Sequence, residues 1–345
     1  MKVRTLDLVL LGGGHSHVAV LKSFGMDPLP GIRVTLISRG VETPYSGMLP
    51  GLIAGHYSYD EAHIGLQPLA RFARARAIFD EAVGLDLANR QVLFDKRPPT
   101  SYDVLSIDIG STPPLHVARG AAHAGSGTTL SRFLDRWSLL SERLRKGEEQ
   151  RVAVVGGGAG GVELLLAVQF RMRTLLEVEG KGGARLEYHL FTDSNQVLPT
   201  HNKSVRRKFE RVLAERGVVV HTGSEVVEVE GSRLRTADGR SHDVDEVLWT
   251  TEAAAAPWLA KSGLAVDEAG FVRVSSTLQS ISHPEVFASG DIAAMVDHPR
   301  PKSGVFAVRQ GPPLARNLRH TMLGEPLETY RPQRRFLSLI TTGDK

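Results

Sequence analysis

The chain carries one pattern of apolar and glycine positions twice. Each copy has a run of four apolar residues, a turn of three glycines and an apolar stretch with helical spacing. The parts are Leu8–Leu11, Gly12–Gly14 and Val18–Phe24 in the first copy, and Val152–Val155, Gly156–Gly158 and Val162–Phe170 in the second. Short, wholly apolar runs are typical of strands buried on both faces of a parallel sheet. The pattern therefore predicts two strand–turn–helix units.

Both copies continue through short strands with alternating apolar positions and close on a further apolar strand. The short strands are expected at Ala77–Phe79, Ala82–Leu87 and Gln91–Phe94, and again at Val218–His221, Glu225–Val229 and Arg233–Thr236. The closing strands are expected within Asp103–Gly110 and Asp245–Glu252. Alternation bounded by turn residues indicates a meander. The predicted fold class is therefore α/β, with two Rossmann-like dinucleotide-binding domains that each carry a β-meander.

A third segment lies outside both copies. An apolar strand is expected within His283–Asp291, followed by a helical pattern at Val305–Leu318 that Pro312-Pro313 should interrupt. We assign this segment to the first domain, which needs it to close over a ligand. The first domain is then discontinuous, with residues 1–118 and 268–345, and the second domain, residues 119–267, is inserted in it. A length of 345 residues suits two domains.

Composition narrows the chemistry. The chain has no cysteine, which excludes disulfides, cysteine-held zinc, iron–sulfur clusters and a CxxC redox pair. Any redox reaction must therefore use a bound cofactor. No stretch approaches the roughly 18 apolar residues of a membrane span. The start at Met1–Arg4 loosely imitates a signal peptide, but Asp7 interrupts the apolar part, so we expect a buried strand and a cytoplasmic protein.

Positive charge gathers near the end of the chain. The net charge is only +4, yet residues 300–335 hold eight Lys and Arg residues against Glu325 and Glu328. This segment is either a solvated face or a contact for an anionic membrane surface or an acidic partner. No nucleic-acid partner is expected. The oligomeric state stays open, with a homodimer as one candidate.

The two glycine turns predict pyrophosphate sites, because a strand–turn–helix places free N–H groups at the helix start. The second turn, Gly156-x-Gly158-x-x-Gly161, is complete. The first has Gly12 and Gly14 but His17 in place of the third glycine. His15 and His17 either donate to phosphate or fill the gap left by the missing glycine. No third ligand lies near them, so no metal site is expected.

The ribose-binding acid of such domains is expected about 20 residues after the turn. The first copy has Ser38-Arg39 there, where Ser38 could bond a ribose hydroxyl and Arg39 could cover an adenine. The second copy has Asp193 after Tyr188–Phe191. An aspartate without an adjacent arginine favours NADH over NADPH. Basic residues at positions 203–208 keep NADPH as the alternative.

With its paired units and a terminal Gly290-Asp291, the sequence resembles the two-dinucleotide flavoproteins of the FAD/NAD(P)-binding pyridine nucleotide-disulfide oxidoreductase superfamily. Within it, Thr43–Gly51 resembles the flavin-side segment of type II NADH dehydrogenases. The sequences of residues 12–17 and 304–311 resemble those of FAD-containing NADH dehydrogenase-like proteins, some of which are fused to a selenide, water dikinase. The resemblance implies FAD in the first domain and NAD(P)H in the second.

The resemblance also implies the site residues. Candidate FAD contacts are Gly12, Gly14, His15, Ser16, Ser38, Arg39, Pro44, Val83, Gly110, Gly290, Asp291 and Val305; candidate NADH contacts are Gly156, Gly158, Gly161, Asp193 and Thr251. Asp291 should hold the ribityl chain. Residues 107–110 and 250–252 depart from the Ala-Thr-Gly usual in the family. Glu163 is the candidate catalytic residue, between nicotinamide and flavin; the alternative is an acid that favours the helix dipole.

The implied reaction is hydride transfer from NADH to FAD, followed by electron transfer to a quinone or other acceptor without a redox disulfide. Two rival hypotheses are a reductase of a small electron-carrier protein and a non-catalytic flavin-binding partner in selenium metabolism. Residues 336–340 read as a strand with no partner to pair it. Peripheral attachment to the inner face of a membrane, through the basic segment, is compatible with the cytoplasmic location.

Overall fold

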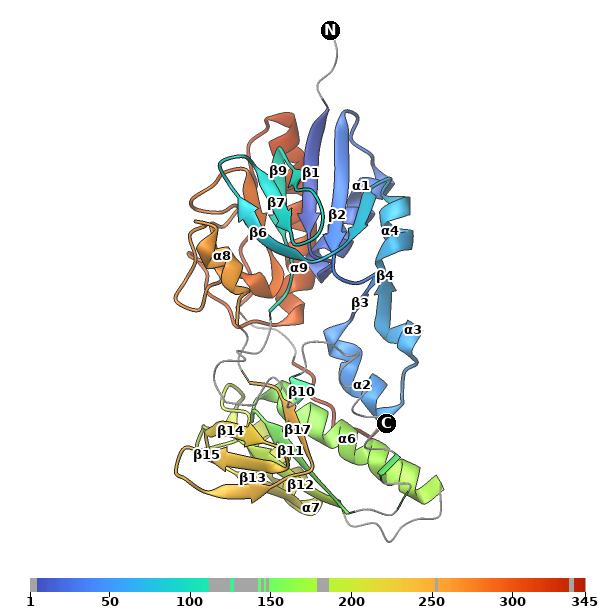
Figure 1. Ribbon diagram of the computed structural model, residues 1–345, viewed down its shortest axis with the longest axis vertical. Coiled ribbons are helices and arrows are strands. Elements are labelled where there is room, and N and C mark those ends of the chain that lie inside the picture. The colour runs from blue at the N-terminus through green and yellow to red at the C-terminus, as the bar shows by residue number, and fades with distance from the viewer. Residues whose placement is uncertain are drawn as a thin grey trace. The chain divides into compact units, whose positions relative to one another are not determined.

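The computed structural model describes residues 5–111, 125–126, 142–143, 146, 149–178, 186–251, 254–334 and 338–344. The chain divides into two compact units (Figure 1). Unit 1 comprises residues 1–47, 63–111 and 253–337, and unit 2 comprises residues 48–62, 112–252 and 338–345. Residues 48–62 and 338–345 belong to unit 2 and residues 253–267 to unit 1, whereas the predicted bounds assign each of these ranges to the other domain.

Unit 1 is built on a five-stranded parallel sheet with the strand order β19-β9-β1-β2-β5. The strands are β1 (Leu6–Leu11), β2 (Ile32–Ser38), β5 (Arg76–Phe79), β9 (Val104–Ile107) and β19 (Val286–Ala288). Leu8 of β1 pairs with Val34 on one side and Val104 on the other. The apolar run of β1 is buried because neighbours flank it within the sheet and side chains cover both faces.

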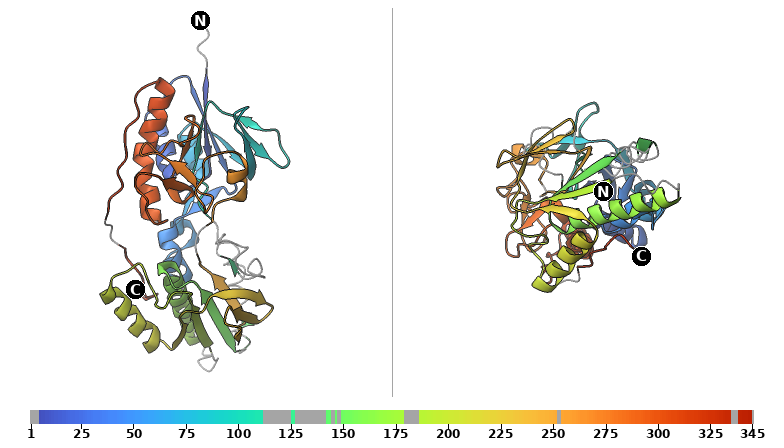
Figure 2. Two further views of the ribbon diagram at one scale, coloured as in Figure 1. Left: turned by 90° about the vertical axis from the view of Figure 1, so that its left-hand side faces the viewer. Right: turned by 90° about the horizontal axis from the view of Figure 1, so that it is seen from below.

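Helices α1 (His15–Met26) and α9 (Gly304–Leu323) pack side by side in unit 1, where α9 is the long red helix in the left view of Figure 2. A Cβ atom on Gly311 would lie 2.5 Å from the Cβ of Ala19, which shows how closely the two helices approach. The predicted interruption of α9 at Pro312-Pro313 is wrong. The carbonyls that these prolines leave unbonded belong to Val308 and Arg309, which are exposed and can bond water.

Smaller elements complete unit 1. They are the antiparallel sheet of β6 (Ala82–Asp86), β7 (Gln91–Phe94) and β8 (Thr100–Ser101), the pair β3 (Glu42–Pro44) and β4 (His63–Gly65), the pair β18 (Val272–Val274) and β20 (Ala293–Met295), and the helices α4 (Leu66–Phe72), α8 (Pro257–Lys261) and η2 (Gly290–Ile292). The helix η1 (Ser46–Met48) lies at the boundary between the two units' residue ranges.

Unit 2 repeats the plan with a parallel sheet in the order β10-β17-β11-β12-β13. Its elements are β10 (Gly125–Ser126), β11 (Gln150–Val155), β12 (Leu186–Phe191), β13 (Val218–His221), β17 (Glu246–Trp249), the meander β14 (Val226–Glu230), β15 (Arg233–Thr236) and β16 (Ser241–Asp243), and the helices α2 (Leu49–Ala54), α3 (Tyr59–Ala62), α6 (Ala159–Val178) and α7 (Lys203–Glu215). The predicted α/β class with two Rossmann-like sheets is confirmed. Among the described residues, no helix has both the length and the apolar character that crossing a membrane requires.

Candidate functional site

The first glycine turn lies between β1 and α1 and packs against the end of β9. Gly12 has φ +102°, and a Cβ atom there would lie 2.2 Å from the carbonyl oxygen of Asp108. The N–H of Gly14 donates to the same carbonyl at 3.1 Å. The turn therefore requires glycine at position 12, because any side chain would strike the backbone of β9's end.

His17 fills the place of the missing third glycine. Its side chain is fully buried, with Nδ1 2.7 Å from the carbonyl oxygen of Gly12 and Nε2 2.8 Å from Oγ of Ser106. Burial lowers the pKa of His17 to about 4, so the ring is neutral at pH 7. We assign the proton to Nδ1, which then donates to Gly12, while the Ser106 hydroxyl donates to Nε2. This geometry fits the hypothesis that His17 fills the gap left by the missing third glycine, and not the hypothesis that it donates to a phosphate.

His15 occupies the first position of α1 and differs from His17. Its ring meets the ring of Tyr45 edge-on at 5.0 Å between centroids, and its Nε2 atom is buried without a hydrogen-bond partner among the described residues. Partial burial lowers its pKa. A buried ring nitrogen without a partner is costly unless a further group bonds it. His15 is thus the one of the two histidines that has an open hydrogen-bonding position.

Asp108 brings a carboxylate to the start of α1, which sequence reasoning did not anticipate. The side chain is 2% exposed, and its Oδ2 accepts the backbone N–H of His17 at 3.1 Å. The backbone N–H of Ser16 also bonds to this carboxylate. Burial is the main cause that raises the pKa of Asp108 to about 7. The available signal was a charged residue directly after the apolar strand Val104–Ile107.

Asp291 lies on the turn that follows β19, next to Asp108. A Cβ atom on Gly290 would lie 2.5 Å from Oδ1 of Asp108. Burial raises the pKa of Asp291, while Lys302 and His15, together with hydrogen bonds from Ser303 and Ser111, act in the opposite direction. Lys302 itself donates to the carbonyl of Ala293 at 2.6 Å and lies over the ring of Phe271. Two carboxyl groups therefore share the site at the start of α1.

The structure gathers some predicted FAD contacts and leaves others apart. Gly12, Gly14, His15, Ser16, Gly290 and Asp291 lie around the start of α1, where the Ser16 hydroxyl donates to the carbonyl of Ala307 at 2.6 Å. Ser38 ends β2, beside Gly13. Arg39 is exposed and lies 3.5 Å from Glu81. Pro44 belongs to β3, Val305 lies in the first turn of α9, and Val83 is exposed on β6. A Cβ atom on Gly110 would meet no described atom within 4 Å. None of the described contacts joins Val83 to this group.

The second glycine turn leaves open space at the start of α6. A Cβ atom on Gly161 would lie 1.9 Å from the carbonyl oxygen of Gly156, so this glycine allows the helix to approach the strand. In contrast, Cβ atoms on Gly158 and Gly160 would meet no other atom within 4 Å among the described residues. Their hydrogens line free space beside a helix start, which is the arrangement that accepts a phosphate.

Two threonines follow the closing strand of unit 2. Thr250 donates its hydroxyl to the carbonyl of Val155 at 3.0 Å, and Thr251 accepts the indole N–H of Trp249 at 2.5 Å. Asp193 is exposed two residues after β12. The basic cluster at positions 203–208 lies on α7, which begins at the N-cap Asn202. The two threonines, Asp193 and the start of α7 all follow strands of the parallel sheet, so they lie at its carboxyl edge, where dinucleotides bind in such folds.

Glu163 is held by a segment far along the chain. The backbone N–H of Thr341 donates to Oε1 of Glu163 at 2.8 Å. Burial raises the pKa of Glu163, and this hydrogen bond acts in the opposite direction. We call residues 338–344 the strap. Within the described residues 338–340 the strap forms no strand, so the strand predicted there is wrong, and Phe336 and Leu337 lie outside the described residues.

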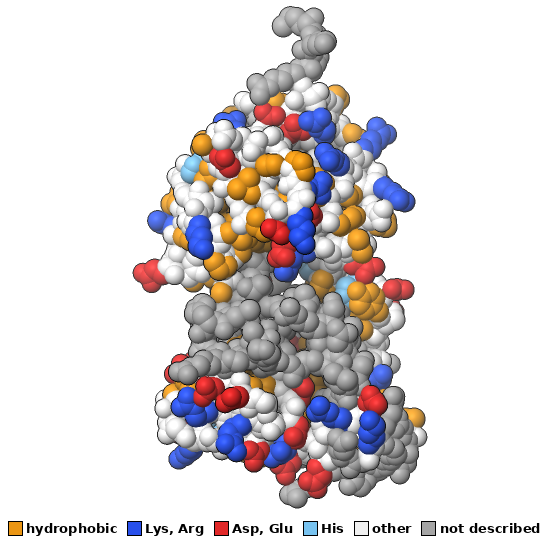
Figure 3. All heavy atoms as spheres, in the orientation of Figure 1, with side chains coloured by type: hydrophobic (Ala, Val, Ile, Leu, Met, Phe, Trp, Pro, Cys, Tyr) orange, Lys and Arg blue, Asp and Glu red, His pale blue; other side chains and the backbone are white. Residues whose placement is uncertain are grey.

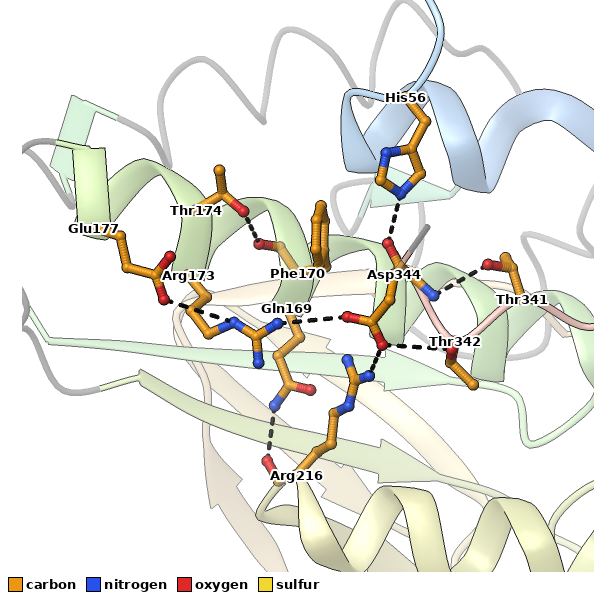
Figure 4. A network of polar contacts seen from close by, with 11 residues as sticks. His56, Gln169, Phe170, Arg173, Thr174, Glu177, Arg216, Thr341, Thr342 and Asp344 are labelled. Carbon is orange, nitrogen blue, oxygen red and sulfur yellow. Dashed lines mark hydrogen bonds and ion pairs between the residues drawn. The ribbon is translucent and has the colours of Figure 1, made fainter.

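The strap is fixed to unit 2 at three further points (Figure 4). The carbonyl of Gly343 lies 2.7 Å from Nε2 of His56. Asp344 forms ion pairs with Arg173 and Arg216. Gly343 has φ +85°, and a Cβ atom there would lie 2.4 Å from the backbone oxygen of Leu166. The strap therefore lies directly on α6 and covers one side of Glu163.

Several side chains of the basic segment bond to other groups of unit 1. Arg300 donates to the carbonyls of Pro332 and Gln333, Arg316 pairs with Glu328, and Arg319 pairs with Asp27. On the face drawn in Figure 3, Lys and Arg side chains are interspersed with Asp and Glu. Arg335 lies outside the described residues. The cytoplasmic location, the membrane contact and the homodimer stay predictions.

Comparison with known proteins agrees with this geometry. The family model described as pyridine nucleotide-disulphide oxidoreductase matches residues 6–311. NADH dehydrogenase-like protein YutJ of Bacillus subtilis (strain 168) is 24% identical over 332 residues, which cover 94% of this chain and 86% of that protein. Demethylphylloquinone reductase NdbB of Synechocystis sp. is 25% identical over 277 residues, which cover 76% of this chain and 66% of that protein. The sulfide:quinone oxidoreductase structure from Aquifex aeolicus shares the fold, with a TM-score of 0.76 at 18% identity over 93% of this chain and 78% of that chain.

Proposed function

This chain belongs to the pyridine nucleotide-disulphide oxidoreductase family, and we propose that it is an FAD-dependent NADH dehydrogenase. Unit 1 binds FAD and unit 2 binds NADH. Hydride passes from NADH to the flavin, and electrons then pass to a quinone-like acceptor. The observation that carries this proposal is the repeated strand–glycine turn–helix, present once in each parallel sheet.

The residues of both turns suit dinucleotides. In unit 1, Nε2 of His15 has no hydrogen-bond partner among the described residues and offers a hydrogen-bonding position at the start of α1, and a Cβ atom on Gly110 would meet no described atom within 4 Å. The carboxyl group of Asp291 lies on the adjoining turn, where it can accept hydroxyl groups of a ribityl chain. In unit 2, the open space at Gly158 and Gly160 leaves the start of α6 accessible to a pyrophosphate.

FAD, when bound, supplies hydride acceptance and electron release. The protein's own part is to hold the two nucleotides and to place a proton-carrying group beside them. Glu163 suits that part because it is partly buried, has a raised pKa and keeps one hydrogen bond from the strap. The chain has no cysteine, so its electrons leave without a dithiol in this polypeptide.

The proposed acceptor is a quinone, which the relationship to a demethylphylloquinone reductase supports. Anaerobic mixing of the FAD-loaded protein with NADH should bleach the flavin absorbance, and a soluble quinone analogue should restore it. If NADH leaves the flavin oxidised, the proposed dehydrogenase is wrong. If reoxidation requires a small iron–sulfur carrier protein instead of the quinone, the acceptor is wrong and the dehydrogenase stands.

We further propose that NADH is preferred over NADPH. Asp193 stands at the end of β12, where an acid can bond a free ribose hydroxyl and would repel a 2′-phosphate. Asp193→Asn should therefore narrow the difference between the rates of flavin reduction by NADH and NADPH. The exposed Asp297 serves as a charge control, since Asp297→Asn should leave both rates unchanged. Faster flavin reduction by NADPH than by NADH in the unmodified protein would contradict this preference and would indicate that the basic cluster on α7 binds the 2′-phosphate.

A further inference from the structure

The two copies of the repeat differ at one position next to the glycine turn. Asp108 follows Ile107 at the end of β9, and Thr250 follows Trp249 at the end of β17. Both residues reach back to their own turn. A Cβ atom on Gly14 would lie 2.3 Å from the carboxylate of Asp108, and one on Gly156 would lie 2.6 Å from the hydroxyl of Thr250. Unit 1 thus holds an ionisable acid where unit 2 holds a neutral hydroxyl.

The Asp108 carboxylate bonds to the start of α1 from inside the unit. It accepts the N–H groups of Ser16 and His17, which belong to the first turn of α1. Such N–H groups are the ones that favour an anion at a helix start. A pyrophosphate at this turn would bring further negative charge close to a carboxylate that water does not reach, because Asp108 is only 2% exposed.

The charged groups around Asp108 do not neutralise it. From α1, His17 faces it as a neutral ring, since burial lowers the pKa of His17 to about 4. From the turn after β19, Asp291 faces it with like charge. The cation on this side, Lys302, interacts with Asp291 and Asp267. His15 likewise interacts with Asp291. Within the described part of the chain, Asp108 forms no ion pair.

We infer that Asp108 is the group that takes up a proton when FAD binds, so that flavin binding by this chain is coupled to protonation of one buried carboxyl group. This inference rests on the proposed function. Like charges in a water-excluded site repel strongly, and adding the pyrophosphate makes the neutral acid the favoured form. The protonated Asp108 keeps one oxygen that can accept an N–H group of α1. Burial already raises the pKa of Asp108 to about 7, so the uptake occurs above neutral pH.

The experiment measures FAD affinity and proton uptake in the full-length apoprotein. Quenching of flavin fluorescence gives the Kd of FAD from pH 6 to pH 9. Calorimetry at pH 8 in two buffers with different enthalpies of ionisation counts the protons taken up. The Kd should be flat near pH 6 and rise toward tenfold per pH unit above pH 7, with uptake approaching one proton. These readouts do not depend on catalytic activity.

Asp108→Asn keeps the shape and an acceptor oxygen but cannot ionise. In this variant the Kd should vary less than twofold across the same range, and the proton uptake should vanish. Asp108→Thr, which copies the matched position of unit 2, should behave in the same way. The exposed Asp297→Asn removes one surface charge from unit 1 and should keep the pH dependence of the unmodified protein.

The outcomes separate the two proposals. If the unmodified protein binds FAD with the same affinity from pH 6 to pH 9, the coupling is wrong and the proposed function stands. If Asp108→Asn keeps the pH dependence, the proton resides elsewhere and the assignment to Asp108 is wrong. If the folded protein binds no FAD at any pH, both the proposed function and the coupling are overturned. Circular dichroism of each variant shows whether it is folded.

Discussion

The backbone N–H of Thr341 donates to the carboxylate of Glu163, although the two residues lie 178 positions apart. The contact links the candidate catalytic acid of unit 2 to the strap. A single N–H donor favours the ionised form of a partly buried carboxylate, whose pKa burial raises. The protonation of Glu163 therefore depends on how the strap lies on α6.

Glu163→Gln should slow flavin reduction by NADH at least tenfold, which corresponds to about 1.4 kcal/mol of barrier. The amide keeps the size of the side chain and removes its charge and its exchangeable acid proton. FAD content and the unfolding midpoint should stay close to those of the unmodified protein. Stopped-flow absorbance gives the rate. Glu177→Gln is the matched control, because Glu177 lies on the same helix and is exposed. Equal rates for the two variants would show that Glu163 only favours the helix start.

Gly343→Ala should displace the strap and move the pH dependence of flavin reduction. The added Cβ would lie 2.4 Å from the backbone oxygen of Leu166, so Gly343 must shift and the hydrogen bond from Thr341 should be lost. Burial is the larger cause of the raised pKa of Glu163, and the displaced strap no longer covers this side chain, so the pKa should fall toward its ordinary value. The limb of the pH–rate profile that reports Glu163 should therefore move to lower pH. In the Glu163→Gln background, Gly343→Ala should leave the pH–rate profile of flavin reduction unchanged.

Gly324→Ala controls for backbone strain alone. Gly324 also has a positive φ, +71°, but a Cβ atom there would meet no other described atom within 4 Å. Both alanine variants therefore carry the left-handed penalty of about 1–2 kcal/mol. A pH profile that moves equally in both variants would show that the strap does not act on Glu163.

Two glycines of the second turn should respond differently to alanine. Gly158→Ala should fold with an unchanged urea midpoint, since its Cβ meets open space, but should bind NADH at least tenfold more weakly. Gly161→Ala should lose about 1–3 kcal/mol of unfolding free energy, because its Cβ would lie 1.9 Å from the oxygen of Gly156. Titration of NADH against intrinsic fluorescence gives the affinity. A Gly158 variant with normal NADH affinity would place the pyrophosphate elsewhere.

Stability should fall in acid partly through His17. Its pKa is about 4 in the folded chain against 6.5 when unfolded, so the unfolded state binds the extra proton between these values. The free energy of unfolding should therefore decrease by about 3 kcal/mol through this residue as the pH falls from 7 to below 4. His17→Gln should lower the proton uptake on unfolding near pH 5 by about one, measured from urea midpoints at several pH values. An uptake that is equal in His17→Gln and in the unmodified protein would contradict the assignment.

Local sequence signals were enough to locate most elements of the two sheets. The strands β7, β13 and β15 have the predicted bounds, because their flanking turns are short-range features. However, β13 and β5 were expected among the short strands of the meanders, and each instead pairs in parallel within the main sheet of its unit. The apolar runs of β1 and β11 also predicted buried strands correctly, since a strand inside a parallel sheet is covered on both faces. The same locality explains the correct placement of both glycine turns.

Contacts between distant residues were beyond the sequence. Asp108 meets Ser16 and His17 only because β9 lies beside β1 in the sheet. A strand was predicted at residues 336–340 from their apolar side chains, whereas the ion pair of Asp344 with Arg173 and the close approach of Gly343 fix the strap on α6. The role of His17 was open for a similar reason, because its partner Ser106 lies on another strand.

The position of β19 has a consequence for synthesis on the ribosome. This strand pairs with β9 at the edge of the unit 1 sheet, yet residues 286–288 emerge after every strand of the unit 2 sheet. A nascent chain can therefore assemble the unit 2 sheet while β9, whose four residues are buried in the finished protein, still has one edge unpaired. The turn that carries Asp291 directly follows β19. Completion of the unit 1 sheet and the arrival of Asp291 beside Asp108 are consequently one event, so a chain stalled before this strand holds Asp108 without its carboxyl neighbour.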